Sequence, residues 1–242
     1  MKIVAKTDVG MVRESNQDSY TTGELPNGVA WAVVCDGMGG AAGGSVASST
    51  AVKVIAEQIT SSFRPGMSAN SIKNMMVSAI NAANISVYDI SCSNSELYGM
   101  GTTVVCAIVM EHTAYIAHAG DSRAYIVSHG ALTQLTRDHS VVQELVEHGK
   151  ITALEAKRHP NKNIITRAVG VSREILVDFS EQEMKDGDVL LLCTDGLTNF
   201  VESDEMCDLT KDDMFYEFAE RLVDRANKNG GGDNVTVVAV TY

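Results

Sequence analysis

Three aspartates stand at the ends of apolar segments that have the length of buried strands. An unpaired carboxylate is costly to bury, so a strand tip is an unusual place for one unless a cation balances its charge. Carboxylate oxygens without a cysteine or histidine cluster beside them suit Mg²⁺ or Mn²⁺. Singly, each aspartate could be an ordinary turn residue, but the repetition favours a metal site. The three are Asp36 after Val29–Cys35, Asp195 after Val189–Thr194 and Asp233 before Val235–Val240.

The first of these aspartates opens the loop Asp36-Gly37-Met38-Gly39-Gly40. Glycine lets the backbone approach an ion closely, so the Gly37 carbonyl could be an oxygen ligand beside the Asp36 carboxylate. A glycine-rich turn between a strand and a helix is the structural alternative. A nucleotide-binding loop is disfavoured, because the spacing is neither G-x-G-x-x-G nor that of a P-loop.

Three further charged residues are candidates for the same site. The planar guanidinium of Arg13 could hold two phosphate oxygens, and Asp18 could accept hydrogen bonds from metal-bound water. Both also fit a solvated charged loop. Asp121 follows another strand and is either a further metal ligand or a turn residue paired with Arg123.

Length and composition indicate one globular domain of 242 residues. A formal net charge of −12 disfavours nucleic acid and anionic membrane as partners. The five cysteines are odd in number and include no C-x-x-C pair, which is typical of a reducing cytosol. The N-terminal residues lack the pattern of a secretory leader. A cytoplasmic location is therefore expected.

Periodicity predicts an α+β fold in which two antiparallel sheets are flanked by helix pairs. Two short helices are expected after the capping residues Ser140 and Thr152, and the strands from Thr102 to Leu135 are expected to form one antiparallel meander. Longer helices are expected over Ser45–Phe63, around Ile72 to Ala83, and in a last segment with Met214, Phe218, Leu222, Val223 and Ala226. Strands are expected near Ile3–Thr7, Val29–Cys35, Thr102–Met110, Thr113–Ala119, Arg123–Ser128, Ala131–Leu135, Leu176–Phe179, Val189–Thr194 and Val235–Val240.

A series of short motifs spans nearly the whole chain and resembles that of the metal-dependent protein phosphatases of type 2C. The lack of long insertions makes the chain most similar to the compact bacterial members, which oppose serine/threonine protein kinases. In order, the motifs are Arg13-x-x-Asn16-Gln17-Asp18, Asp36-Gly37-Met38-Gly39-Gly40, Gly101-Thr102-Thr103, Gly120-Asp121-Ser122-Arg123, Thr194-Asp195-Gly196-Leu197 and Gly232-Asp233-Asn234-Val235-Thr236.

This resemblance implies a four-layer α-β-β-α sandwich with a binuclear Mn²⁺ or Mg²⁺ centre at one end. Two such ions lower the pKa of a bound water, so hydroxide can attack a phosphate near neutral pH without a covalent enzyme step. For the two ions, the resemblance implies that Asp36 bridges both, that the Gly37 carbonyl binds one, and that Asp195 and Asp233 complete the other. It further implies that Asp18 acts through water and that Asp121 and Asp195 hold a weaker third ion. Arg13 is implied to bind the substrate phosphate.

The resemblance also implies a mobile flap over about residues 140–171 within a single catalytic domain, 1–242. Met38 departs from the pattern, since many eukaryotic relatives have there a histidine assigned as general acid; a metal-bound water could replace it. Phosphorylated proteins, among them a cognate serine/threonine kinase, are the expected partners of a monomer. Two other classes stay open: a phosphoprotein-binding pseudophosphatase or regulatory module, and a two-metal nuclease, which the negative charge disfavours.

Overall fold

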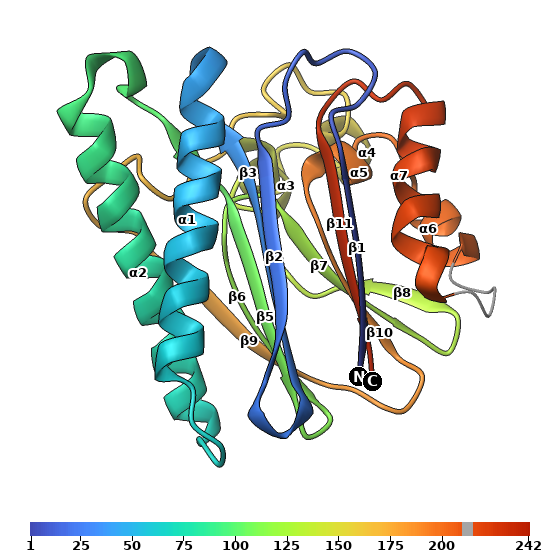
Figure 1. The fold of residues 1–242 in the computed structure, drawn as a ribbon. Helices are drawn as coiled ribbons and strands as arrows, with labels where there is room; N and C mark the ends of the chain where they lie inside the picture. Colours follow the sequence, from blue (N-terminus) through green and yellow to red (C-terminus); the bar gives the residue numbers. More distant parts are fainter. Residues whose placement is uncertain (210–214) are drawn as a thin grey trace.

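Two antiparallel β-sheets pack face to face in the middle of the molecule (Figure 1). The computed structural model describes residues 1–209 and 215–242. In spatial order, the first sheet contains β1 (Lys2–Asp8), β11 (Val235–Thr241), β10 (Val189–Cys193), β7 (Arg123–Ser128) and β8 (Ala131–Gln134). The second contains β2 (Asp18–Leu25), β3 (Val29–Met38), β5 (Val104–Met110), β6 (Thr113–Ala119) and β9 (Asp178–Glu183), and the short β4 (Gly101–Thr102) pairs with β3.

Helices cover the outer face of each sheet, which confirms the expected four-layer α-β-β-α sandwich (Figure 1). The long helices α1 (Gly40–Ser62) and α2 (Ala69–Ser93) lie over the second sheet; α5 (Asp195–Thr198), α6 (Ser203–Leu209) and α7 (Phe218–Lys228) lie over the first. Met214, expected in the last helix, lies outside the described residues. Within the described chain, no helix combines the length and the apolar character that crossing a membrane requires.

The core has three layers that follow from the alternation of side chains along the strands. On β3, Val33 and Cys35 face α1 and α2, whereas Ala32 and Val34 face the space between the sheets. All four side chains are fully buried. A strand covered on both faces reads as a continuous apolar run, which is why this segment was recognisable from the sequence.

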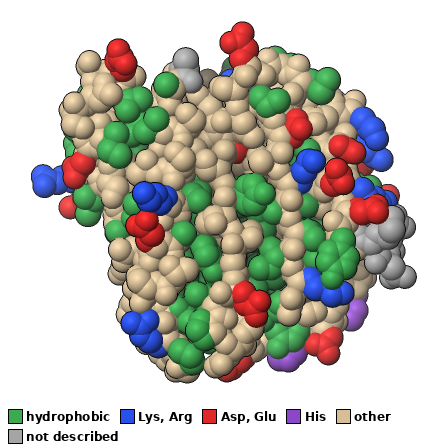
Figure 2. Space-filling view, in the orientation of Figure 1, with side chains coloured by type: hydrophobic (Ala, Val, Ile, Leu, Met, Phe, Trp, Pro, Cys, Tyr) green, Lys and Arg blue, Asp and Glu red, His purple; other side chains and the backbone are tan. Residues whose placement is uncertain are grey.

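Two of the edge strands, β1 and β2, are only partly covered. Ile3 and Ala5 of β1 and Tyr20 of β2 lie partly exposed against the cluster between the sheets. Figure 2 shows this side of the molecule, with hydrophobic side chains between the strands and charged side chains of both signs interspersed around them. Part of the cluster between the sheets is therefore close to the surface at this side.

Strand β2 was not expected from the sequence, which has few apolar residues between Asp18 and Leu25. The strand forms because β3 offers it a partner along its whole length. Gly23 pairs with Trp31, and a Cβ atom at Gly23 would lie 2.6 Å from the Trp31 ring nitrogen. The glycine that weakened the strand pattern thus makes room for a large core side chain.

The expected meander from Thr102 to Leu135 is divided between the two sheets. Strands β5 and β6 belong to the second sheet, and β7 and β8 to the first. The chain crosses between the sheets at Gly120–Ser122, where Gly120 has φ +115°. Periodicity predicts strands but not which sheet each one joins, so a single meander was the wrong topology. The crossing places Asp121 at the end of the sandwich.

The segment 140–171, here called the flap segment, contains α3 (Val141–Glu147) and α4 (Ala153–Ala156). As expected, Ser140 caps the first helix and Thr152 caps the second, the latter in a reciprocal capping box with Glu155. The C-terminal end of the segment is fixed to the sandwich by a bridge between Thr102 and Val169 and by a hydrogen bond from the Gly170 N–H to the buried Asn84 of α2. The flap segment is therefore anchored beside the loops that carry the aspartates.

Candidate metal centre

Four aspartates line one open pocket of about 850 Å³ at the end of the sandwich opposite the chain termini. They are Asp36 after β3, Asp121 at the crossing between the sheets, Asp195 at the start of α5 and Asp233 before β11. Gly37 and Arg13 line the same pocket. The loops that form it gather at the upper end of the molecule in Figure 1. The fold thus brings together residues as far apart in the sequence as Arg13 and Asp233, which are separated by 220 positions.

Asp18 lies buried beside this group and joins the two sheets. It pairs in register with Asp36 of the neighbouring strand. Its Oδ2 atom accepts hydrogen bonds from the hydroxyl groups of Thr194, at 2.9 Å, and Thr236, at 2.7 Å. Both threonines belong to the other sheet, at the end of β10 and in β11. These contacts fix one oxygen of Asp18 and leave the other available.

The backbone of Asp36 is held on both sides by the segment before β5. Its N–H donates to the Thr103 hydroxyl at 2.9 Å, and its carbonyl accepts from the Thr103 N–H at 2.8 Å. The Thr102 hydroxyl also donates to that carbonyl. The next residue must be glycine, since a Cβ atom at Gly37 would lie 2.0 Å from the Gly44 carbonyl oxygen in the first turn of α1.

The loop that carries Arg13 is tied to the residue after Asp233. The Asn234 Oδ1 accepts from the Gln17 N–H at 2.8 Å, and its Nδ2 donates to the carbonyls of Val9 and Ser15, each at 2.9 Å. Arg13 itself donates to Asp233 Oδ2 at 2.9 Å. Its side chain is 54% exposed. The guanidinium thus stands at the pocket rim, within reach of both solvent and the aspartates.

Asp121 is not the ion-pair partner of Arg123. Arg123 instead forms a bidentate ion pair with Asp138, with Nε 2.9 Å from Oδ1 and Nη2 2.7 Å from Oδ2. The turn with an internal salt bridge, one of the two alternatives for Asp121, is therefore wrong. The Asp121 carboxylate faces the pocket together with Asp195, whose Oδ2 accepts from Asn199 at 2.9 Å.

Burial and mutual repulsion raise the pKa of four of these carboxyl groups, those of Asp18, Asp36, Asp121 and Asp195. Burial, followed by the charges of Asp18 and Asp195, raises the pKa of Asp36 well above its ordinary value. Burial also raises the pKa of Asp18 and the pKa of Asp121 to about 7. It raises the pKa of Asp195 above its ordinary value too. Carboxylates buried so close together favour a neighbouring positive charge when they ionise.

The donor set of this cluster fits divalent metal ions. Among the described residues, the buried Oδ1 atoms of Asp18 and Asp195 have no hydrogen-bond partner. Buried polar atoms are nearly always paired, so such orphans call for a ligand. Several carboxylates and a backbone carbonyl form the all-oxygen environment that Mg²⁺ and Mn²⁺ prefer.

The residues that orient the aspartates were not assigned roles from the sequence. Thr103, Thr194 and Thr236 hold aspartates through hydroxyl groups. Asn163 and Ile165 of the flap segment line the pocket. Thr194 and Thr236 carried a detectable signal, because each is a hydroxyl residue in a buried strand close to a site aspartate. Asn163 carried none, since only the folding back of the flap segment brings it to the pocket.

Known proteins match this chain over nearly its full length. Residues 12–236 match the family model described as Protein phosphatase 2C. The serine/threonine phosphatase stp of Listeria monocytogenes is 38% identical over 97% of this chain and 93% of its own. The structure of the S. agalactiae serine/threonine phosphatase superposes with a TM-score of 0.93 at 32% identity, covering 100% of this chain and 99% of that one.

A further solved structure contains metal. It is the catalytic domain of the serine threonine protein phosphatase PstP in complex with 2 manganese ions, which superposes with a TM-score of 0.85 at 33% identity over 98% of this chain and 96% of that one. Fold, motif series and an all-oxygen site agree with these relatives. The chain therefore belongs to the protein phosphatase 2C family.

Proposed function

We propose that the whole chain, residues 1–242, is a single catalytic domain whose active site is the aspartate-lined pocket. The protein is a metal-dependent protein serine/threonine phosphatase with Mn²⁺ or Mg²⁺ as its cofactor. The observation that carries the assignment of the site is the convergence of Asp36, Asp121, Asp195 and Asp233 on one pocket with Arg13 at its rim. Asp36 and the Gly37 carbonyl, with Asp195 and Asp233, would hold two ions.

Bound ions would supply a nucleophilic water at neutral pH and neutralise the charge of the phosphate. The chain itself contributes orientation. The Asp36 peptide is locked by Thr102 and Thr103, so its carboxylate stays aimed at the pocket. Asp18, whose Oδ2 is fixed by two threonines, keeps Oδ1 for a hydrogen bond from a water molecule in the site.

Arg13 is proposed to bind the substrate phosphate. A guanidinium is protonated at every physiological pH, and the hydrogen bond with Asp233 raises its pKa further. A planar fork can hold two phosphate oxygens at once. In the structure the fork already reaches the pocket through Asp233, and a phosphate dianion placed between the aspartates and the rim would compete for it.

Met38 lines the pocket in place of a titratable side chain. We assign protonation of the departing serine or threonine oxygen to water rather than to residue 38. Asp121 is proposed to hold a weaker third ion together with Asp195. The flap segment, residues 140–171, contributes Asn163 and Ile165 to the pocket wall and is proposed to act as the flap beside the substrate.

The function is tested with a phosphothreonine peptide and a small aryl phosphate. With Mn²⁺ present, both should be hydrolysed, and a chelator should stop turnover reversibly. The Asp36→Asn variant is the matched control, because it removes a charge without changing size. Binding of phosphopeptide without hydrolysis by the Mn²⁺-loaded wild type would instead identify a pseudophosphatase.

We further propose a monomer in the cytoplasm that opposes a cognate serine/threonine kinase. The substrates are phosphoproteins, as the family implies. Sedimentation at micromolar concentration tests the monomer. A comparison of phosphoproteomes with and without the gene tests the opposition to a kinase: kinase activation-loop phosphothreonines should accumulate in its absence. Unchanged kinase phosphorylation would contradict the proposal that the protein opposes a kinase, but it would not bear on the phosphatase activity itself.

A further inference from the structure

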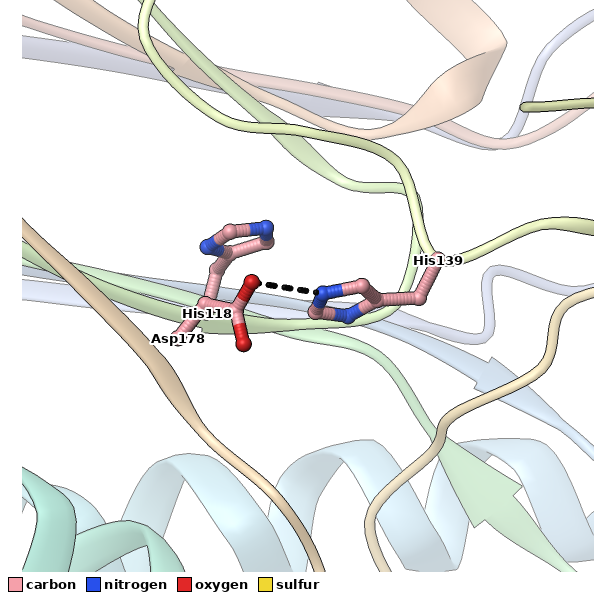
Figure 3. Close-up of side chains that lie close together, drawn as sticks. All are labelled: His118, His139 and Asp178. Carbon is pink, nitrogen blue, oxygen red and sulfur yellow. Dashed lines mark hydrogen bonds and ion pairs between the residues drawn. The ribbon is translucent and has the colours of Figure 1, made fainter. Parts of the chain in front are cut away.

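A buried pair of histidines lies outside the catalytic pocket, where the flap segment begins. His118 of β6 and His139 stack with their ring centroids 4.7 Å apart and their planes at 7°. Asp178, at the start of β9, turns its carboxylate toward His139 (Figure 3). Only 1% of His139 is exposed. None of the three residues lines the pocket, so the site described above does not account for them.

The hydrogen bonds of His139 determine where its proton lies. The N–H of Gly120 donates to His139 Nδ1 at 3.1 Å, so Nδ1 must be unprotonated. The proton is then on Nε2, which lies 3.2 Å from Asp178 Oδ2 and donates to it. Burial lowers the pKa of His139, which favours this neutral ring.

Arg167 also orients the Asp178 carboxylate that holds the His139 ring. Arg167, near the end of the flap segment, donates to Asp178 Oδ1 at 2.7 Å. Partial burial alone would raise the pKa of Asp178, but the hydrogen bonds from His139 and Arg167 lower it below its usual value. The carboxylate is therefore charged, and it holds together His139, which immediately precedes the flap segment, and Arg167, which lies near its end.

His139 forms hydrogen bonds with both backbone polar groups of Gly120, the residue before Asp121. The His139 ring accepts a hydrogen bond from the Gly120 N–H, and the backbone N–H of His139 donates to the Gly120 carbonyl at 2.9 Å. The two peptide planes that flank Gly120 are thereby fixed. Residue 120 cannot be held by a side chain, since a Cβ atom there would lie 2.7 Å from Thr103 and the φ angle is +115°. The direction of the next side chain, Asp121, depends on these backbone contacts.

We propose that His139 is a positioning residue that aims the Asp121 carboxylate into the metal centre, and that Asp178 and Arg167 hold His139 in the required orientation. The flap segment and the weak metal position are then mechanically linked through one imidazole. The inference rests on the proposed function only in taking Asp121 as a metal ligand; the grip on Gly120 is independent of it.

A metal ion bound by the histidine pair and Asp178 is a weaker interpretation of the same cluster. Their ligand atoms lie within 4.8 Å of one another. However, Arg167 already brings the positive charge, with its Nη1 3.2 Å from His139 Nε2. His118 also faces the Arg137 carbonyl through Nε2, at 2.8 Å. The cluster is balanced without an ion.

Two amide substitutions separate the two functions of the ring. Asparagine places an oxygen near the position of Nδ1 and can accept from Gly120, but it loses Asp178. Glutamine places a nitrogen near Nε2 and can donate to Asp178, but it loses Gly120. His139→Gln should therefore release the Gly120 peptide, whereas His139→Asn should keep it in place.

The first measurement is hydrogen exchange of the Gly120 amide in the metal-free full chain, which does not depend on activity. We expect exchange about tenfold faster in His139→Gln than in His139→Asn, the effect of losing one hydrogen bond. The second is a calorimetric Mn²⁺ titration, in which only the weakest binding step should weaken in His139→Gln. Equal behaviour of the two variants in both measurements would reduce His139 to a packing residue.

Two additional variants keep the outcome interpretable. If His139→Gln does not fold, Asp178→Ala removes the support of the ring from a partly exposed position and should also accelerate Gly120 exchange; unchanged exchange would overturn the proposal. Asp121→Asn separates this inference from the proposed function. An unchanged Mn²⁺ titration in Asp121→Asn would end the role of Asp121 as a ligand, while Gly120 exchange would still decide the role of His139.

Discussion

Asp36 stands at the centre of the site because the charges of the other four aspartates act on it while its own peptide is rigidly held. A carboxylate in that position does not serve packing, since burial among like charges destabilises the metal-free protein. Asn199 fixes one carboxylate oxygen of Asp195, and Thr194 and Thr236 fix one of Asp18, so that the other oxygen of each is left for a ligand. The residues of the site are thus arranged for binding rather than for stability.

Replacing Asp36 by asparagine should abolish most turnover and stabilise the metal-free fold. Loss of metal-derived charge stabilisation is worth several kcal/mol, so kcat should fall by about a hundredfold or more. Removing one buried negative charge should raise the melting temperature without metal above that of the wild type at pH 7.5. Turnover and thermal unfolding measure the two effects. Near-normal kcat at saturating Mn²⁺ would remove Asp36 from the centre.

Replacing Arg13 by alanine should raise KM more than it lowers kcat, because a fork on the phosphate acts largely in ground-state binding. A hydrogen bond to a charged group is worth about 1.5–3 kcal/mol, which sets the upper limit of the loss. Arg13→Lys is the control, since it keeps the charge and loses the fork. Unchanged KM for both peptide and aryl phosphate would leave Arg13 as a surface partner of Asp233.

The types of the site residues were readable from the sequence, but their partners were not. Asp36, Asp195 and Asp233 each adjoin an apolar strand, and that position alone singled them out. The partner of Arg123 could not be identified, because Asp138 lies fifteen positions away and reaches it only after β7 and β8 have folded. A local pattern reports what a residue can do, whereas its partner depends on the topology.

At the scale of elements, the ends of the strands and the two ends of the flap segment position the residues of the site. Two strands from different sheets meet at Asp18, and the crossing from β6 to β7 delivers Asp121. Helices and buried strands were predictable because their periodicity is local. The edge strand β2 and the division of the meander were not, since both depend on pairing between distant segments.

The buried Asn84 of α2 anchors the end of the flap segment. Its Oδ1 accepts from the Gly170 N–H at 2.7 Å, and its Nδ2 donates to the carbonyls of Ser172 and Arg173. Gly170 has φ +88°, and a Cβ atom there would lie 2.2 Å from Val87 of the same helix. Helix α2 thus clamps the point where the flap segment returns to the sheet.

Asn84→Ala should destabilise the protein by about 1–3 kcal/mol, because the buried Gly170 N–H is left without a partner. Proteolysis within residues 140–171 should also become faster. Asn81→Ala is the matched control on the same helix, since its side chain donates to the Val77 carbonyl within α2. Denaturant unfolding and limited proteolysis measure both effects. Equal effects of the two substitutions would show that Asn84→Ala acts by disturbing helix α2 and not by breaking the contact between Asn84 and Gly170.

At the scale of the whole molecule, folding and metal loading are coupled through protons. The folded-state pKa values of Asp36 and Asp195 are raised, and those of Asp18 and Asp121 reach about 7. An unfolded aspartate titrates near ~3.9. Between these values the folded metal-free protein binds more protons than the unfolded chain, so its stability falls as pH rises.

Two buried histidines act in the opposite direction. Burial lowers the pKa of His118 and of His139, so their contribution is complete above about pH 6.5, the unfolded value, and is lost as pH falls. Four aspartates oppose two histidines, so the aspartates should dominate. The metal-free protein should therefore lose stability from pH 5 to pH 7.5, which thermal unfolding in a chelating buffer measures.

Saturating Mn²⁺ should reverse this slope, because the ions bind the deprotonated carboxylates and compete with their protons. At pH 6 each loading event should release protons, which calorimetry in buffers of different ionisation enthalpy counts directly. Asp36→Asn should release fewer protons, since one titrating carboxylate is gone, whereas a distant exposed change such as Glu57→Gln should release as many as the wild type. Loading without proton release at pH 6 would mean that the aspartates are already ionised, and the raised pKa values would then not describe the metal-free site.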